Sequence, residues 1–413
     1  MKKIFIITIV LFVYGHSFFA QEKLTFIKAT STKIKILDGD DLREGDLAPE
    51  LKPDIYAYHK SFRQKKIVFY TDVDSISFVV NPGDIYNFAV LLNNKDTCYQ
   101  RLTFENPNKV FYSRLSQKNS LTNDTIQFVL GANNAIHIKG KLNNSDILDL
   151  IFDTGASLGV LSEEGSRKKA RLDKANKNKF EFSGITIENS PAIFVDYNGG
   201  LKADGVIGYN AFEDKIVEIN YDKSIIVIHN SNDNISKSYS VIDMIWRGSG
   251  LFIEGILNIK NKKHNGLFLF DTGSKFALSL TKDFATTNQL YDVMPKVGTR
   301  RGRGVNGKTI KSNTVNLPQL IIADLSLENV PIDLELQSDN EGLDKNILGN
   351  DVLKRFNVIL DYKNGLIYLQ TNSLASNAYS KSSDEYFILI ALGILLGLSI
   401  IGFIIYRKRN ANR

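Results

Sequence analysis

Two stretches decide the fold of this chain: Leu148-Asp-Leu-Ile-Phe-Asp153-Thr-Gly-Ala-Ser157 and, further along, Gly266-Leu-Phe-Leu-Phe-Asp271-Thr-Gly-Ser274. Each is an apolar run with the length and composition of a buried β-strand, followed by Asp-Thr-Gly. One copy of so short a motif would be weak evidence of function. Two copies that both follow a strand indicate one structural unit used twice.

The sequence on either side of the two motifs repeats in the same order. Residues 135–143 match 250–258 at an offset of 115, and residues 206–228 match 347–369 without a gap at an offset of 141. Because the correspondences keep their order along the chain, they indicate a duplication.

The duplication predicts two strand-rich lobes, residues 126–238 and 239–371, joined by a polar segment over 230–238. We expect at most one short helix in each lobe, directly after Gly208 and after Gly349.

The chemistry of such a duplication lies in its two carboxylates. If the lobes pack about a pseudo-twofold axis, Asp153 and Asp271 face each other, and two carboxylates a few ångströms apart cannot both ionise easily. The pair then keeps one proton over an extended pH range and titrates as a unit. The ionised Asp can take a proton from a bound water molecule while the protonated Asp polarises a carbonyl group. This chemistry requires no metal, cofactor or nucleophilic side chain.

With these features the stretch from Ile126 to Gln370 resembles the pepsin and retropepsin clan of aspartic peptidases. The resemblance rests on both Asp-Thr-Gly motifs and on two apolar-apolar-Gly motifs, Val206-Ile207-Gly208 and Ile347-Leu348-Gly349. It implies a mainly β, bilobal fold with Asp153 and Asp271 as the catalytic pair. It also implies interlocking threonines, supporting loop residues and glycines that pack beneath the loops, which are Thr154, Gly155, Ala156, Thr272, Gly273, Ser274, Gly208 and Gly349.

The two loops differ at the third position after the aspartate. Ala156 lacks a hydroxyl that could stabilise an ionised carboxylate, whereas Ser274 has one. We therefore expect a pH optimum less acidic than that of pepsin. Lys275, which follows Ser274, stands where this family usually has a small or acidic residue, so the second loop departs from the family pattern.

A single flap is expected, and it falls in the second lobe. Asp153 and Gly208 are 55 residues apart, but Asp271 and Gly349 are 78 apart. The first half has therefore lost a hairpin that the second half keeps, around Gly298 to Ile310. Its expected tip comprises Arg303, Gly304, Val305, Asn306 and Gly307.

Residues 302–307 of this hairpin also match the dinucleotide-binding pattern G-x-G-x-x-G. That site requires a buried strand before the glycines and a helix after them. Polar and basic residues precede the motif here, and strand-forming residues follow it. We therefore interpret it as a glycine-rich flap, whose Arg300, Arg301, Arg303 and Lys308 either favour acidic groups or are merely solvated.

Both ends of the chain have the patterns of targeting segments. Residues 1–20 begin with two lysines, continue with an apolar run and end in small residues, as a secretory signal peptide does. Near the other end, residues 387–405 include Ser399 as their only polar side chain, which is enough for a transmembrane helix over 386–406.

Charge around that helix sets its orientation. Arginine and lysine after it place the tail, residues 407–413, in the cytoplasm by the positive-inside rule. Residues 21–385 then lie outside the cytoplasm, in the periplasm of a Gram-negative host. The Ser- and Asn-rich residues 372–385 are expected to be a flexible linker that holds the lobes near the membrane.

The charge of the chain is explained by the same ends. The protein has 51 Lys and Arg against 45 Asp and Glu, which would favour nucleic acid as a partner. Six of these bases lie in the two terminal segments, and without them the chain has 45 of each sign. The basic surplus therefore reports membrane topology, and we expect no nucleic-acid partner.

An all-β module, residues 21–125, precedes the lobes, because short runs rich in β-branched and aromatic residues alternate there with turn residues. We expect a binding or spacer role. Cys98 is the single cysteine, so no disulfide can form within the chain. A catalytic thiol is a weak alternative, because no His-bearing motif accompanies it.

The leading hypothesis is a membrane-anchored, extracytoplasmic aspartic endopeptidase that acts as a monomer on polypeptides, without metal or cofactor. The alternative is a surface protein that kept the fold, lost hydrolysis and binds peptides or a partner.

Overall fold

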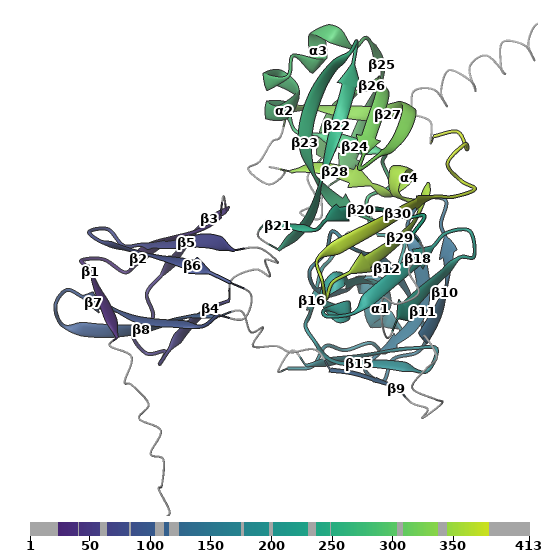
Figure 1. The fold of residues 1–413 in the computed structure, drawn as a ribbon. Helices are drawn as coiled ribbons and strands as arrows, with labels where there is room; N and C mark the ends of the chain where they lie inside the picture. The colour runs from purple at the N-terminus through teal and green to yellow at the C-terminus, as the bar shows by residue number, and fades with distance from the viewer. Residues whose placement is uncertain are drawn as a thin grey trace, which may run out of the picture. The chain divides into compact units, whose positions relative to one another are not determined.

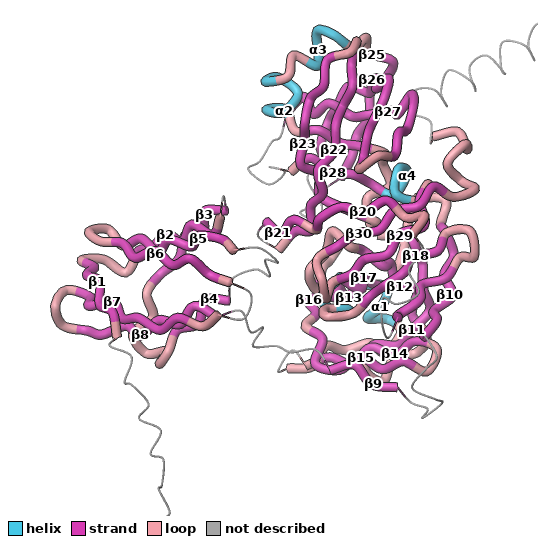
Figure 2. The backbone as a smooth tube through the Cα atoms, viewed as in Figure 1, coloured by secondary structure: helices cyan, strands magenta, loops and turns pink. Residues whose placement is uncertain are grey.

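The computed structural model of the protein describes residues 24–39, 41–57, 64–81, 84–103, 111–114, 124–174, 177–197, 201–229, 237–247, 249–303, 309–337 and 345–379. The described chain is mainly β (Figure 2) and forms two compact units, the first ending at Thr103. The expected signal peptide, membrane helix and tail lie outside the described residues. No helix within those residues is both long enough and apolar enough to span a membrane.

The first unit consists of two four-stranded sheets (Figure 1), with strand orders β1-β7-β8-β4 and β3-β2-β5-β6. Aromatic rings from both sheets meet in its core: the Phe88 ring on β7 lies 5.0 Å from Phe69 on β5 and 5.4 Å from Phe78 on β6. Cys98 on β8 is buried in this unit, and burial raises the pKa of its thiol, which disfavours the reactive thiolate. The strands are β1 (Thr25–Ala29), β2 (Lys33–Asp38), β3 (Asp41–Asp46), β4 (Asp54–Ala57), β5 (Lys65–Tyr70), β6 (Ser75–Val80), β7 (Tyr86–Leu92) and β8 (Asp96–Thr103).

The boundary of the N-terminal module differs from the expected residue 125. Strand β9 (Phe111–Arg114) pairs with β15 (Ile185–Ser190) of the first lobe, with Phe111 opposite Glu188. Among the described residues, the chain from Phe111 onward accordingly belongs to the second unit. A four-residue strand has no pattern that identifies its partner sheet, so the sequence could not assign it.

The second unit contains two lobes with the same sheet topology. The strand order is β16-β13-β17-β12-β11 in the first lobe and β27-β24-β28-β23-β22 in the second. The registers also agree, because Asp153 lies opposite Gly208 and Asp271 lies opposite Gly349 in parallel pairs. One continuous apolar core runs through both lobes. The strands are β11 (Ile136–Leu142), β12 (Leu148–Asp153), β13 (Gly159–Leu161), β16 (Ala192–Phe194), β17 (Gly205–Gly208), β22 (Gly250–Ile259), β23 (Lys262–Asp271), β24 (Leu278–Leu280), β27 (Leu325–Gln337) and β28 (Asn346–Gly349).

Strands from both lobes join in one further run, β10-β19-β18-β29-β30-β20. At its centre Glu218 on β18 lies opposite Ile359 on β29, which is its own counterpart at the offset of 141. The local twofold axis therefore passes through this pair. The strands are β10 (Asp124–Leu130), β18 (Ile216–Asn220), β19 (Ile225–His229), β20 (Ser240–Asp243), β29 (Phe356–Asp361) and β30 (Leu366–Thr371), and β21 (Ile245–Arg247) extends the sheet of the second lobe beside β22.

Short helices follow both glycines as expected: the 3-10 helix η1 (Tyr209–Phe212) and α4 (Asn350–Leu353). The limit of one helix per lobe was wrong, because α1 (Glu163–Arg167), α2 (Lys282–Thr287) and α3 (Leu290–Val293) are also present. Hydroxyls start two of them: Ser162 Oγ accepts from the Gly165 N–H, and Thr281 Oγ1 accepts from the Phe284 N–H, both at 3.2 Å. Such caps stabilise helices too short to show an apolar periodicity.

The second lobe contains the additional hairpin that the spacing predicts. Strand β25 (Lys296–Arg303) pairs with the first half of β26 (Thr309–Ile322), and Arg303 lies opposite Thr309. The first lobe has only the shorter hairpin of β14 (Asn178–Phe182) and β15, which corresponds to the second half of β26 with β27. The expected tip residues 304–307 lie outside the described residues. Because Thr309 begins a strand, the helix that a dinucleotide motif requires does not follow the glycines.

The beginning of the expected linker is not a free coil. The Arg355 guanidinium is buried and donates through Nη1 to the carbonyls of Leu374, Ala375 and Asn377, at 3.2, 2.8 and 2.7 Å. It also lies 3.6 Å from the ring centroid of Tyr379. Residues 372–379 therefore belong to the second lobe, and a Ser- and Asn-rich composition could not reveal their shared anchor.

Candidate functional site

The structure brings the two aspartates together at the ends of β12 and β23. Each carboxyl group packs against the glycine of the opposite loop. A Cβ on Gly155 would lie 2.6 Å from Cγ of Asp271, and a Cβ on Gly273 would lie 2.3 Å from Cγ of Asp153. No real side chain tolerates that approach, so glycine is required at both positions for the carboxylates to meet.

Backbone N–H groups hold each carboxylate within its own loop. Asp153 Oδ1 accepts from Gly155 at 2.8 Å and from Ala156 at 3.2 Å. Asp271 Oδ1 accepts from Gly273 and Ser274, both at 2.9 Å. The two loops therefore offer their aspartates equivalent donors.

The hydroxyl of Ser274 lies elsewhere than the sequence suggested. Its Oγ is next to Gly349, where an added Cβ would lie 2.9 Å away, and Ser274 binds Asp271 through its backbone N–H. Ala156 and Ser274 therefore bind the two carboxylates in the same way, through their backbone N–H groups. The less acidic pH optimum was expected from the hydroxyl of Ser274. It stays a prediction, but these contacts give it no support.

Burial and mutual proximity perturb both acids. Burial raises the pKa of Asp153, against the lowering effect of the N–H groups that it accepts. The pKa of Asp271 is raised well above its usual range, first by burial and then by the negative charge of Asp153. Two adjacent carboxyl groups of this kind retain a proton at pH values where isolated aspartates are ionised.

The two threonines interlock beneath the carboxylates, and both are fully buried. Thr154 Oγ1 donates to the Phe270 carbonyl at 2.7 Å and accepts from the Thr272 N–H at 3.0 Å. Thr272 Oγ1 donates to the Phe152 carbonyl at 2.9 Å and accepts from the Thr154 N–H at 3.0 Å. These reciprocal bonds join the bases of the two loops across the lobes.

The glycines of the apolar-apolar-Gly motifs lie directly under the loops. A Cβ on Gly208 would lie 2.5 Å from the Ala156 carbonyl oxygen, and one on Gly349 would lie 2.2 Å from that of Phe276. Neither position has room for a side chain. Glycine is therefore required at the point where each motif strand passes beneath its loop.

The basic residues of the β25–β26 hairpin are not all available to a ligand. Arg300 is buried, forms a 2.8 Å ion pair with Asp333 on β27, and lies 4.8 Å from the ring centroid of Phe276. Asp333 neutralises it, so Arg300 does not offer a free charge to an acidic group. Arg301 is exposed, and the side chain of Arg303 lies outside the described residues.

Sequence reasoning missed Tyr197, which follows β16. Its pKa is raised by burial and then by the negative charge of Asp153, which places its hydroxyl within electrostatic range of the site. Tyr197 packs with Ala156 and Leu201 against a small cluster of the first lobe. It belongs to no motif, so no signal in the sequence could have identified it.

Neither metal-ligand geometry nor comparison with known proteins indicates chemistry beyond that of the two aspartates. No group of three or more His, Cys, Asp or Glu side chains is arranged to hold a metal ion in the part of the chain that the structure describes. No protein-family model matches the chain, and a comparison with curated proteins finds no match. A functional interpretation therefore rests on the geometry of the two loops.

Proposed function

We propose that this protein is a membrane-anchored aspartic endopeptidase on a bilobal, aspartic-peptidase-like fold. One observation carries the proposal: each aspartate packs against the glycine of the opposite loop above a reciprocal threonine contact. That arrangement makes two acids from different lobes into one site. Because one chain supplies both lobes, the monomer is a complete active unit.

In the proposed mechanism the two acids share one proton, because burial raises the pKa of both and their negative charges repel each other. The step is described with the proton on Asp271 and with Asp153 as the ionised partner. Asp153 takes a proton from a water molecule bound between the two acids, and the hydroxide oxygen attacks the peptide carbonyl carbon. Asp271 donates its proton to the carbonyl oxygen. In collapse of the tetrahedral intermediate, Asp153 returns its proton to the leaving nitrogen, the C–N bond breaks, and Asp271 recovers a proton from the hydroxyl.

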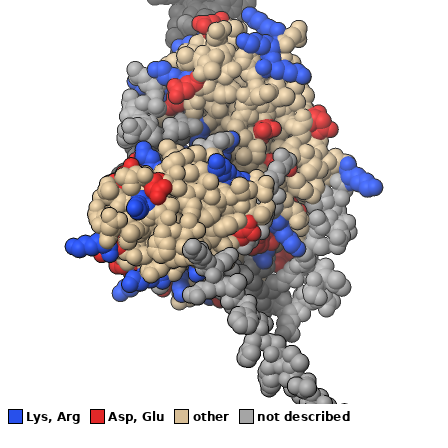
Figure 3. Space-filling model, turned by 60° about the vertical axis from the view of Figure 1, so that its left-hand side comes forward, with Lys and Arg blue, Asp and Glu red and all other residues tan. Residues whose placement is uncertain are grey.

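The site is proposed to act on polypeptides outside the cytoplasm, since residues 1–20 and 386–406 have the patterns of an export signal and a membrane anchor. Nucleic acid is not among the proposed partners. On the face shown in Figure 3, Lys and Arg are interspersed with Asp and Glu.

The test is cleavage of a peptide library by the purified full-length chain, followed by mass spectrometry across a range of pH. Asp153→Asn and Asp271→Asn should each abolish cleavage, because each removes one proton carrier while keeping the side-chain shape. Asp149→Asn is the matched control: Asp149 lies on β12 too, but it contacts His137 at 3.2 Å instead of the dyad.

Cleavage that survives Asp153→Asn or Asp271→Asn would overturn the proposal. Peptide binding without cleavage at any pH would instead support the binding protein considered as the alternative.

A further inference from the structure

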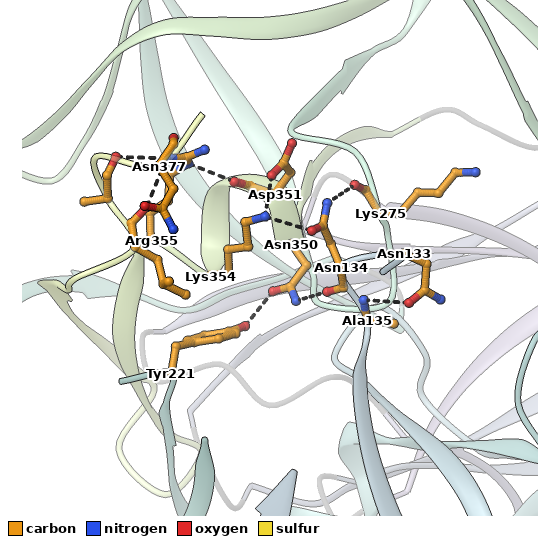
Figure 4. A network of polar contacts seen from close by, with 12 residues as sticks. Asn133, Asn134, Ala135, Tyr221, Lys275, Asn350, Asp351, Lys354, Arg355 and Asn377 are labelled. Carbon is orange, nitrogen blue, oxygen red and sulfur yellow. Dashed lines mark hydrogen bonds and ion pairs between the residues drawn. The ribbon is translucent and has the colours of Figure 1, made fainter. Parts of the chain in front are cut away.

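Asn134 connects the first lobe to the loop of the second aspartate (Figure 4). It lies in the turn between β10 and β11, is 7% exposed and has a left-handed φ of 61°. Its side-chain N–H donates to the Lys275 carbonyl at 3.0 Å, and its Oδ1 accepts from Lys354 Nζ at 2.7 Å. Its backbone carbonyl accepts from the side chain of Asn350. All three of these contacts cross to the second lobe.

These partners are the groups that hold the Asp271 loop. Lys275 follows Ser274, whose N–H binds the Asp271 carboxylate. The Asn350 N–H donates to the Ser274 carbonyl at 2.7 Å. Asn134 therefore bonds directly to the loop at Lys275 and indirectly, through Asn350, at Ser274.

Tyr221 fixes the orientation of Asn350. Its hydroxyl donates to Asn350 Oδ1 at 2.5 Å, which leaves the Asn350 Nδ2 group to donate to Asn134. Tyr221 is buried, and burial raises the pKa of its hydroxyl, so the hydroxyl stays a donor over the whole working pH range. The network therefore does not itself titrate through Tyr221.

Among the described residues, the Asp153 loop has no equivalent of the amide contact. The counterparts of Asn350 and Asn134 at the two offsets are Tyr209 and Ser249, and the Tyr209 hydroxyl donates to the Ser249 carbonyl at 2.7 Å. Within the described residues, the Ser249 side chain makes no hydrogen bond to the Asp153 loop. The backbone contact is thus duplicated, but in the described chain the side-chain contact to the loop is present only on the Asp271 side.

We propose that Asn134 is a positioning residue that sets the Asp271 carboxylate against Asp153 from the opposite lobe. The kinetic consequences of this inference rest on the proposed function. Without the amide, the carbonyl of Lys275 loses its anchor and the loop can shift relative to Asp153. Because a misplacement of about 1 Å can cost roughly 100-fold in rate, a partial shift should lower kcat about tenfold.

The test variant is Asn134→Gly. Glycine retains the left-handed backbone and the carbonyl that accepts from Asn350, so the change removes only the side-chain amide. Asn143→Gly is the matched control, because Asn143 also has a left-handed φ of 54° in the first lobe and its Nδ2 donates to the Arg171 carbonyl at 2.6 Å, away from the site.

With peptide substrate, Asn134→Gly should lower kcat about tenfold, leave KM within about twofold and move the pH limits of kcat, because dyad geometry sets those limits. Asn143→Gly should alter none of these. An unchanged kcat and pH profile in Asn134→Gly, or an equal change in Asn143→Gly, would overturn the positioning role.

A second measurement keeps the inference testable if the wild-type protein cleaves no peptide. The pH dependence of the unfolding free energy of the full chain, compared with and without Asp271→Asn, isolates the titration of Asp271. Asn134→Gly should shift the pH of this step and Asn143→Gly should not. No shift in Asn134→Gly would reject the inference independently of whether the protein is a peptidase.

Discussion

Replacing Thr154 by valine tests whether the interlocked threonines hold the site together. Valine has nearly the same shape, so the change removes a hydroxyl without creating a large cavity. That hydroxyl donates to the Phe270 carbonyl and accepts from the Thr272 N–H. Both bonds are lost in Thr154→Val, and both partner groups remain buried in the opposite lobe.

The expected cost follows from these two bonds. Each contributes about 1 kcal/mol net, and leaving a buried polar group without a partner costs about 1–3 kcal/mol. We therefore expect Thr154→Val to lower the unfolding free energy by roughly 2–4 kcal/mol, a large share of the ~5–15 kcal/mol typical of a domain. Thr154→Ser keeps the hydroxyl and loses one methyl group, so it should cost only about 1 kcal/mol.

The assay is urea denaturation followed by tryptophan fluorescence. Trp246 is the single tryptophan of the chain and lies in the second unit, 4.9 Å between ring centroids from Tyr209. Its signal therefore reports the unit that contains the site. A Thr154→Val protein within about 0.5 kcal/mol of wild type would refute the reasoning, because surface-like changes have effects of that size.

Three further changes test other contacts. Gly273→Ala should lower kcat about 100-fold, because the added Cβ would lie 2.3 Å from the carboxyl carbon of Asp153. Gly45→Ala is the control and should leave kcat unchanged, because its Cβ would lie 3.7 Å from the nearest atom, on Ile34. The pKa of Asp271 is raised in the folded state, so its contribution to stability is present below the unfolded pKa of about 3.9 and is lost as pH rises through the folded pKa. Asp271→Asn should therefore flatten this fall in the unfolding free energy. An unaltered slope would contradict the assignment. Arg300→Met should destabilise the protein by about 3–5 kcal/mol in urea titrations, because the buried Asp333 loses its cationic partner and, among the described residues, keeps only the hydrogen bond from Thr314. Asp333→Asn added to it should restore part of that loss.

Much of the site was predictable because its information is local. A strand followed by Asp-Thr-Gly specifies a turn with a carboxylate at a fixed place, and a repeated sequence forms the same structure twice. The strand pairing repeats accordingly, since Asp153 lies opposite Gly208 as Asp271 lies opposite Gly349. The 55- and 78-residue spacings likewise indicated the hairpin of β25 and β26.

Other features depend on partners distant in sequence. From the sequence, Arg300 was expected either to favour acidic groups or to be solvated. In the structure its charge is neutralised by Asp333, which lies 33 residues later in the chain. The composition of residues 372–379 predicted a flexible coil, but three carbonyl groups of this segment accept hydrogen bonds from Arg355. The amino-acid composition of a segment indicates how it behaves in water, but tertiary packing determines which buried group it contacts.

By itself, the sequence determined that two equivalent loops, each with one aspartate, would be placed by two copies of one strand arrangement. The tertiary structure decided how the copies differ. Asn134 reaches the carbonyl of Lys275, whereas Ser249, its counterpart, makes no such contact with the other loop in the described chain. Duplication makes local geometry alike because local geometry follows from local sequence. Contacts between lobes depend on side chains that diverged separately, so two similar loops acquire different surroundings.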